Sequence, residues 1–273
     1  MLDAAAGIIH FASEAMFGAL RLVWVEQGYD PLDFALVCLG GAGPLHANAM
    51  GILSDAWPVI IPPGPGVLCA RGDATTSVQD EATRTYIRMA EDVTKEQLTA
   101  DLKELEAKAS EALIEDGIGK EDHVVNYQAD IRYAGQAFEI TVDFTEEELN
   151  KQGVNVITDQ FDDEHDQLFS FKLDDGHEIL MIRAVVKAKA TEMAAAAVGS
   201  ADKELKDCII HESKFYYDGD WHDINLYDRN LLHSGIVVPG PSIVMEMDST
   251  TVILPGHEAK VDEVGNLLIN PSK

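Results

Sequence analysis

A short run of glycines between an expected strand and an expected helix is the part of this sequence best suited to chemistry. The apolar residues 36–39 are followed by Gly40-Gly41-Ala42-Gly43 and then by Pro44-Leu45-His46. Adjacent glycines let the backbone turn sharply and let a ligand approach main-chain N–H groups without interference from Cβ atoms. Proline suits the first position of a helix. The junction could therefore present free amides to an anion or a nucleotide, although many tight turns share this pattern.

Four polar residues outside this run are further candidates for a site. Asp130 and Arg132 lie two apart in an expected strand and therefore on one face. They fit either a cross-strand ion pair or a contact with a substrate or another subunit, and the same two interpretations apply to Gln136. Asp248 precedes three hydroxyl residues at 249–251, and local turn hydrogen bonds explain this loop as well as a ligand does.

No spacing in the sequence assigns a catalytic or metal-binding constellation. The 9 histidines form no cluster with the spacing of metal ligands, and no Ser–His–Asp arrangement can be defended. We therefore assign no catalytic acid, base or nucleophile, and we expect no metal site in the chain itself. Three widely spaced cysteines, at 38, 69 and 208, predict no disulfide framework. They fit a cytoplasmic protein with reduced thiols.

Composition and charge limit the classes of partner. The 273 residues are 46% hydrophobic and 25% charged, as in a soluble globular protein. With 20 basic and 48 acidic residues the net charge is −28, which argues against nucleic acid and anionic membranes as partners. A solvated acidic surface is the simplest explanation; adaptation to salt or a basic partner are alternatives. His10, Glu14 and Arg21 interrupt the most apolar stretch, 8–25, so we expect a helix ended by Gly28 rather than a membrane span.

The chain divides into three expected regions by its pattern of apolar and turn residues. Residues 1–90 read as α/β, with a long helix, strands at 34–39 and 58–62 and a helix at 44–54. Residues 91–204 read as α+β, with a helix at 94–116, strands at 123–130, 131–142 and 179–186, and an acidic helical stretch at 145–171 interrupted at Gly153. Residues 190–201 are expected to be a linker. Residues 205–273 read as a small all-β domain whose first hairpin turns at Asp218-Gly219.

Taken in order, these segments resemble the hydantoinase A/oxoprolinase family. The family includes N-methylhydantoinase A, 5-oxoprolinases and the nucleotide-binding subunits of acetone- and acetophenone-type carboxylases. The matching segments are 26–34, Gly40 to His46, 62–68, 130–136, Met247-Asp248-Ser249-Thr250-Thr251 and Gly265-Asn266-Leu267. The resemblance implies a partial actin/hexokinase-like ATPase lobe followed by the α+β and all-β regions. It also implies that Gly40, Gly41, Ala42 and Gly43 contact the adenosine part of ATP. His46 would contact nucleotide or substrate, or simply pack.

One expected family feature has no counterpart in this sequence. The Asp-x-Gly-Gly-Thr hairpin that grips phosphate in the first half of the ATPase is absent, so we expect a C-terminal portion. A truncation, a split gene and a misplaced start codon all remain open. The resemblance implies ATP and Mg²⁺ in the intact enzyme, with the missing N-terminal half and a hydantoinase B-like subunit or domain as partners.

The resemblance implies a small-molecule substrate and leaves three functions open. It implies phosphorylation of an amide or enolate oxygen in the intact enzyme, and ATP-dependent opening of a cyclic amide is the first of the three functions. ATP-dependent carboxylation of a ketone is the second. The third is a binding or interface fragment without activity of its own, and we expect no ATP hydrolysis by the isolated chain.

Overall fold

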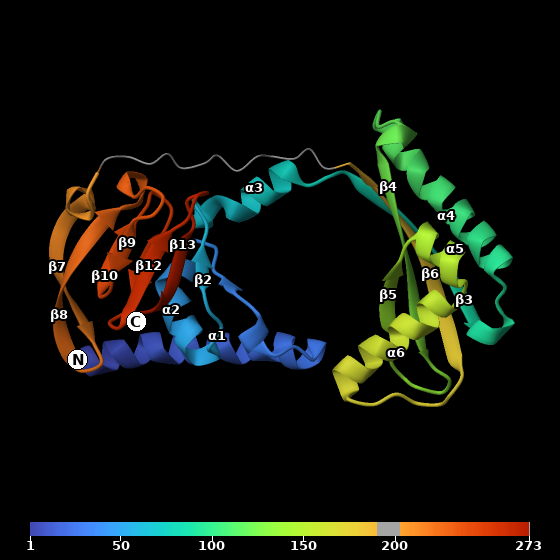
Figure 1. The fold of residues 1–273 in the computed structure, drawn as a ribbon, viewed down its shortest axis with the longest axis horizontal. Helices are drawn as coiled ribbons and strands as arrows, with labels where there is room; N and C mark the ends of the chain where they lie inside the picture. The colour runs from blue at the N-terminus through green and yellow to red at the C-terminus, as the bar shows by residue number, and fades with distance from the viewer. Residues whose placement is uncertain (190–202, 273) are drawn as a thin grey trace. The chain divides into compact units, whose positions relative to one another are not determined.

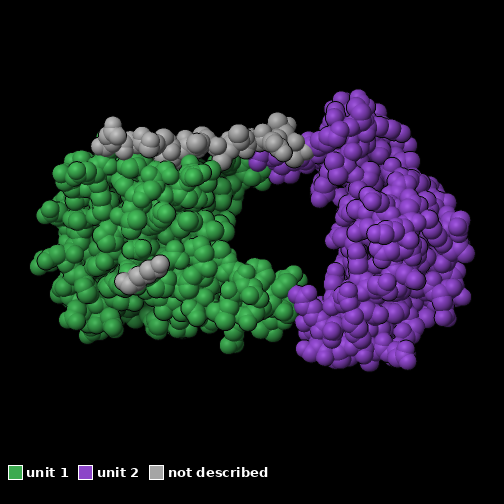
Figure 2. All heavy atoms as spheres, in the orientation of Figure 1, with its two compact units in different colours: residues 1–74, 193–273 green, residues 75–192 purple. Residues whose placement is uncertain are grey.

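The computed structural model describes residues 1–189 and 203–272, which form two compact units (Figure 2). Unit 1 combines Met1–Ala74 with Met193–Lys273, and unit 2 is Thr75–Glu192. The expected linker at 190–201 lies outside the described residues. The structure thus divides the chain differently from the three expected regions.

The long helix α1 of unit 1 is exposed along most of its length. It spans Leu2–Gln27 and ends as expected at Gly28, whose φ of +65° is left-handed. The helix buries Ser13, while Ile8 and Phe11 are exposed by 70% and 76%. By length and composition α1 is able to cross a membrane, in contrast to the expectation from its charged residues. A single helix of this kind near the N-terminus is weak evidence for a membrane span.

Unit 1 contains two sheets that share one core with helix α2 (Gly43–Ser54), whereas helix α3 (Leu68–Thr75) buries none of its residues (Figure 1). The first sheet has the order β1-β2-β13-β12-β9 and the second β11-β10-β8-β7. Their strands are β1 (Leu36–Val37), β2 (Val59–Ile61), β7 (Ile209–Tyr217), β8 (Asp220–Asp228), β9 (Val237–Pro239), β10 (Ser242–Met245), β11 (Thr250–Ile253), β12 (His257–Val261) and β13 (Leu267–Pro271).

The C-terminal strands are part of the same unit as the N-terminal region. Strand β13 pairs antiparallel with β2, so that Ile269 lies opposite Val59. Val59 and Ile269 are fully buried in one hydrophobic cluster together with Ala47 of α2. Residues 205–273 are all-β as expected, but they complete the sheet begun by β1 and β2 because each half buries the other's apolar face.

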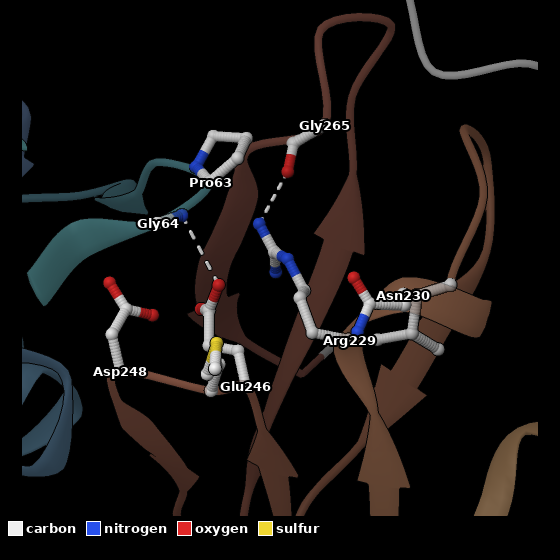
Figure 3. A pocket seen from close by; sticks show the side chains of 9 residues that line it. Pro63, Gly64, Arg229, Asn230, Glu246, Asp248 and Gly265 are labelled. Carbon is white, nitrogen blue, oxygen red and sulfur yellow. Dashed lines mark hydrogen bonds between the residues drawn. The ribbon is translucent and has the colours of Figure 1, made fainter. Parts of the chain in front are cut away.

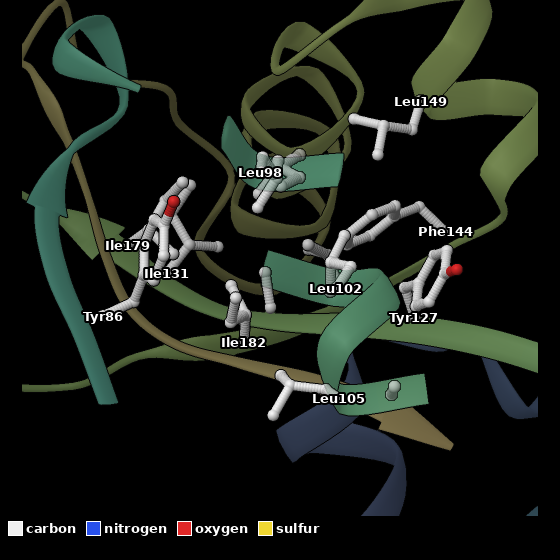
Figure 4. Close-up of a cluster of buried hydrophobic side chains, with 14 of the residues drawn as sticks. Tyr86, Leu98, Leu102, Leu105, Tyr127, Ile131, Phe144, Leu149, Ile179 and Ile182 are labelled. Carbon is white, nitrogen blue, oxygen red and sulfur yellow. The ribbon is translucent and has the colours of Figure 1, made fainter. Parts of the chain in front are cut away.

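Unit 2 is an antiparallel sheet of order β3-β6-β4-β5 with helices packed on one face. Fully buried Leu98 and Leu102 of α4 pack in one cluster with Ile131 and Ile182 of the sheet (Figure 4). Thr94 caps α4 by accepting from the Gln97 N–H. The elements are β3 (Gln79–Met89), α4 (Lys95–Glu115), β4 (His123–Tyr133), β5 (Ile140–Phe144), α5 (Glu146–Gln152), α6 (Asn155–Phe169) and β6 (His177–Ala188).

One expected strand is divided and another is shorter than the sequence predicts. Residues 131–142 do not form one strand, because β4 continues to Tyr133, the chain turns at Gly135, where φ is +86°, and β5 begins at Ile140. The strand expected at 34–39 is reduced to Leu36–Val37. The expected helices 44–54 and 94–116, the break at Gly153 and the hairpin at Asp218-Gly219 are confirmed.

Candidate functional site

Three segments that are far apart in sequence meet at one place in unit 1. The Gly40 N–H donates to the Pro65 carbonyl at 2.7 Å. A Cβ added to Gly41 would lie 3.4 Å from the carbonyl oxygen of Asp248, and one added to Gly66 would lie 2.6 Å from the same atom. The glycine loop, the proline–glycine loop at 62–66 and the loop at 246–249 are therefore in contact.

Parallel strand pairs explain why these loops meet. Strands β1 and β2 are parallel neighbours, so the glycine loop and the proline–glycine loop leave the same edge of the sheet. Strands β8 and β10 are also parallel, with Asp228 opposite Met245, so Arg229 and Glu246 begin the segments that follow at one edge. Ligands of α/β proteins bind characteristically outside the carboxyl ends of parallel strands.

The glycine loop is open and offers backbone groups. Gly40 has φ of +87°, a conformation that strongly favours glycine. Gly41 and Ala42 are exposed, and no side chain caps the start of α2. The N-terminal amides of a helix that lack a side-chain cap can bind an anion or a nucleotide.

His46 lies on α2 away from the three loops, half-buried against α1. Its Nδ1 is 3.2 Å from the Ser13 hydroxyl, which donates to the Ile9 carbonyl at 3.1 Å. Because the Ser13 hydroxyl already donates to Ile9, the Nδ1–H of His46 donates to the Ser13 oxygen. It also borders a separate cavity of about 610 Å³ formed by α1, α2 and the β7–β8 hairpin. This contact supports the packing interpretation.

A cavity of about 390 Å³ that is lined by Arg229, Glu246 and Asp248 adjoins the proline–glycine loop (Figure 3). Arg229, 8% exposed, donates from Nη2 to the Gly265 and Ile61 carbonyls, the latter at 3.3 Å. Glu246 accepts from the Gly64 N–H at 3.2 Å through Oε2. Within the described residues no hydrogen-bond partner reaches Arg229 Nη1, Glu246 Oε1 or Asp248 Oδ2, all of which are buried.

Burial shifts the ionisation of both charged groups at the base of the cavity. It raises the pKa of Glu246, and the positive charge of Arg229 partly opposes this effect. Burial also lowers the pKa of Arg229. Sequence reasoning found Asp248 but missed Arg229 and Glu246. Glu246 immediately precedes the matching segment 247–251 and could have been found by extending it, whereas no sequence pattern marks Arg229.

Of the four polar candidates, only Asp248 contacts the glycine loop within the described residues. Asp130, Arg132 and Gln136 lie in unit 2. Arg132 donates to Glu178, its direct neighbour on β6, from Nε at 2.9 Å and from Nη2 at 2.7 Å. Asp130, 8% exposed, accepts from the Thr141 hydroxyl at 2.6 Å. These contacts match the ion-pair interpretation of Arg132.

Gln136 is held in an aromatic cluster of unit 2. Its Nε2 lies 3.3 Å from Nε2 of fully buried His165. The His165 Nδ1 lies 2.9 Å from the Phe171 carbonyl, so Nδ1 carries the proton and Nε2 accepts from the glutamine. The Phe171 carbonyl thus sets the tautomer of His165, and Gln136 donates to the nitrogen that remains.

The described residues contain no group of three or more His, Cys, Asp or Glu side chains arranged to hold a metal ion. The cysteines at 38, 69 and 208 are free. Burial raises the pKa of the Cys38 thiol to about 11, so this side chain behaves as a packing residue.

Comparison with known proteins relates nearly the whole chain to one family. The profile described as hydantoinase/oxoprolinase matches residues 1–82, and that of the hydantoinase/oxoprolinase C-terminal domain matches residues 88–269. The chain is 31% identical to an uncharacterized protein of Methanocaldococcus jannaschii, covering 98% of this chain and 38% of the relative. It is 27% identical to caprolactamase subunit alpha of Pseudomonas jessenii, covering 98% and 39%.

Two solved structures share the fold. The ATP-dependent caprolactamase from Pseudomonas jessenii superposes with a TM-score of 0.82 at 26% identity, over 99% of this chain and 40% of that one. Acetone carboxylase in its nucleotide-free form gives 0.67 at 21% identity, over 99% and 40%. Both have the actin-like ATPase fold. The chain spans about two fifths of the length of these proteins, and by sequence and fold it belongs to the hydantoinase/oxoprolinase family.

Proposed function

We propose that this chain is the C-terminal portion of an ATP-dependent enzyme that opens a cyclic amide. The observation that carries the proposal is the open loop Gly40–Gly43, which has no side-chain cap and lies at the carboxyl end of parallel strands. The relatives support the reaction class, since they include a caprolactamase and 5-oxoprolinases.

The shape of the glycine loop suits the nucleoside part of ATP. Gly41 and Ala42 offer exposed backbone, and the absence of side chains at 40, 41 and 43 lets a flat nucleoside lie against the main chain. Bound ATP, with Mg²⁺, would supply a phosphoryl group that makes an amide oxygen easier to displace. The chain's own contribution is to bind and orient the nucleoside, and we assign no residue here to the metal.

The exposed apolar side of α1 supports the proposal of a missing N-terminal half. Ile8, Phe11 and Val25 are exposed by 70%, 76% and 68%, and exposed apolar surface of this extent marks an interaction site. We propose that the N-terminal half covers it, which gives the helix a protein neighbour rather than a membrane. A hydantoinase B-like subunit would complete a cytoplasmic enzyme.

Cyclic-amide hydrolysis is preferred over ketone carboxylation because of the better structural match. The caprolactamase matches with a TM-score of 0.82, against 0.67 for acetone carboxylase. Acetophenone carboxylase gamma subunit of Aromatoleum aromaticum is 25% identical over 94% of this chain, which keeps carboxylation as the outcome to test.

The test completes the enzyme and measures both reactions. The chain is co-expressed with the N-terminal part of caprolactamase subunit alpha and with that enzyme's partner subunit. We expect ATP-dependent phosphate release with ε-caprolactam or a hydantoin, and none from the isolated chain. Phosphate release that requires bicarbonate and a ketone would overturn the hydrolase assignment.

A variant of the glycine loop tests the nucleotide site separately. Gly41→Val places a branched side chain on the exposed loop, and we expect it to abolish ATP binding by the completed enzyme in calorimetry. The variant Gly72→Val, in α3 where an added Cβ meets nothing within 4 Å, serves as the control. Unchanged ATP affinity in a folded Gly41→Val variant would remove the glycine loop from the site.

A further inference from the structure

The cavity beside the proline–glycine loop is lined by three charged side chains, each with one polar atom that no described residue satisfies. Arg229 is more than nine-tenths buried, and its Nη2 is fixed by two backbone carbonyls. Arg229 lines the cavity, and its buried Nη1 has no partner among the described residues. Unsatisfied buried polar atoms are rare in folded proteins, and an ordered water, an ion or a bound ligand can satisfy them.

Two carboxylates face the same cavity from the loop that follows β10. Glu246 is held by the Gly64 N–H through Oε2, which leaves Oε1 free. Asp248 Oδ2 is also without a partner in the described part of the chain. Figure 3 shows the guanidinium of Arg229 and the two carboxylates around one opening.

The charges select the kind of ligand. A simple anion would gain from Arg229 but would be repelled by Glu246 and Asp248. A simple cation would be attracted by the two carboxylates but would leave Arg229 Nη1 without a partner. A molecule with both charges satisfies all three groups. Its carboxylate accepts from Arg229 Nη1, and its ammonium donates to Glu246 Oε1 and Asp248 Oδ2.

We propose that this cavity binds a small zwitterionic amino acid. Its volume of about 390 Å³ lies within the range of small-molecule sites. The need for two opposite charges follows from the cavity itself. The choice of an ω-amino acid, the class of molecule that results from opening a lactam ring, rests on the proposed function.

The ionisation of the cavity fits such a ligand. Burial raises the pKa of Glu246 and lowers the pKa of Arg229, and the opposite charges nearby oppose these shifts only in part. A bound ammonium would favour the ionised form of Glu246, and a bound carboxylate would favour protonated Arg229.

The experiment measures binding to the full chain, without ATP, by calorimetry at neutral pH. The probe is 6-aminohexanoate; hexanoate and hexylamine each carry one of its charges, and ε-caprolactam carries neither. We expect 6-aminohexanoate to bind at least tenfold more tightly than any of the other three. Amide NMR should show shifts at Gly64, whose N–H contacts Glu246, and at Gly265, whose carbonyl contacts Arg229.

Isosteric variants test the individual contacts. Asp248→Asn and Glu246→Gln should each weaken binding of 6-aminohexanoate at least fivefold. Glu263→Gln removes one charge from the exposed turn before β13 and should leave the affinity unchanged. Asp248 lies in a half-exposed loop, so its variant keeps the test valid if Glu246→Gln fails to fold.

Specific outcomes would overturn the proposal. Equal binding of hexanoate or hexylamine would show a site for one charge, and wild-type affinity in Asp248→Asn would remove that carboxylate from the site. Failure here leaves the proposed function intact, since ATP-dependent ring opening is measured separately. Tight binding of 6-aminohexanoate in a completed enzyme that opens no lactam would refute only the proposed function.

Discussion

Replacing Gly66 by alanine tests whether the proline–glycine loop and the Asp248 loop really touch. The added carbon would lie 2.6 Å from the Asp248 carbonyl oxygen and 2.8 Å from its Oδ2. Gly66 has no left-handed φ, so alanine is compatible with the local backbone and the expected effect comes from the contact.

The size of the effect follows from the shortfall in space. Ordinary contact begins at 3.4 Å, so the Asp248 backbone must move by roughly 0.8 Å, and overpacking of this kind costs about 1–3 kcal/mol. Alanine restricts the unfolded chain and thereby returns about 0.4–1 kcal/mol. We expect a net loss of about 1–2 kcal/mol in the free energy of unfolding of unit 1.

Tryptophan fluorescence measures this change in unit 1. The chain has 3 tryptophans, Trp24, Trp57 and Trp221, and all lie in the segments of unit 1. With a urea slope of about 2 kcal/mol/M, the midpoint of unfolding should fall by about 0.5–1 M. The slope itself should not change, because the substitution leaves the surface exposed on unfolding unaltered.

A second glycine in the same unit provides the matched control. An added Cβ at Gly72, in α3, meets no atom within 4 Å, so Gly72→Ala should stabilise the helix by about 0.5–1 kcal/mol. The same substitution, glycine to alanine, is therefore expected to lower the free energy of unfolding at position 66 and to raise it at position 72. If Gly66→Ala raised the midpoint as Gly72→Ala does, the contact between the loops would be refuted, and with it the site built on it.

Three further predictions concern unit 2, and urea unfolding followed by far-ultraviolet circular dichroism measures each. Tyr133 donates to Asp162 at 2.6 Å, and its pKa is raised to about 12 by burial and by this carboxylate. Its extra stabilisation is therefore complete below about pH 10 and lost as pH rises towards 12, so the stability advantage over Tyr133→Phe should shrink across that interval. Leu102→Ala empties a fully buried position and should cost about 2–5 kcal/mol; a loss under 1 kcal/mol would contradict the packing of α4 on the sheet. Arg132→Gln breaks a partly exposed ion pair with Glu178 and should cost under about 1 kcal/mol. A large loss of activity in the completed enzyme at unchanged stability would instead make Arg132 a substrate or subunit contact.

Local signals predicted most of the individual elements. Helix α1 ends at Gly28, α4 begins at its Thr94 cap, and the hairpin turns at Asp218-Gly219, where φ is +49° and +88°. Each depends on neighbours within a few residues, so the sequence pattern is sufficient. The strand expected across Gly135 failed because the alternation of apolar residues continues through a turn that only the positive φ reveals.

Pairing between distant strands could not be predicted in the same way. The apolar run that forms β13 is as compatible with a separate small domain as with a place beside β2. Burying it against Val59 gives unit 1 one core in place of two small ones, and larger cores bury a greater fraction of their surface. The choice is thus set by the total surface buried, which no local pattern records.

The same distinction separates the two halves of the candidate site. In the proposed site the glycine loop acts through its backbone, and that backbone conformation requires glycine. A few adjacent residues of the sequence are therefore enough to predict it. Arg229 and Glu246 work through side chains, and their proximity depends on the parallel register that sets Asp228 opposite Met245. A shift of that register by one residue would turn each side chain to the other face of its strand end. The charged cavity is therefore a product of topology, and a relative that keeps the glycine motif but changes the pairing of β8 with β10 should keep the glycine loop and lose the charged cavity.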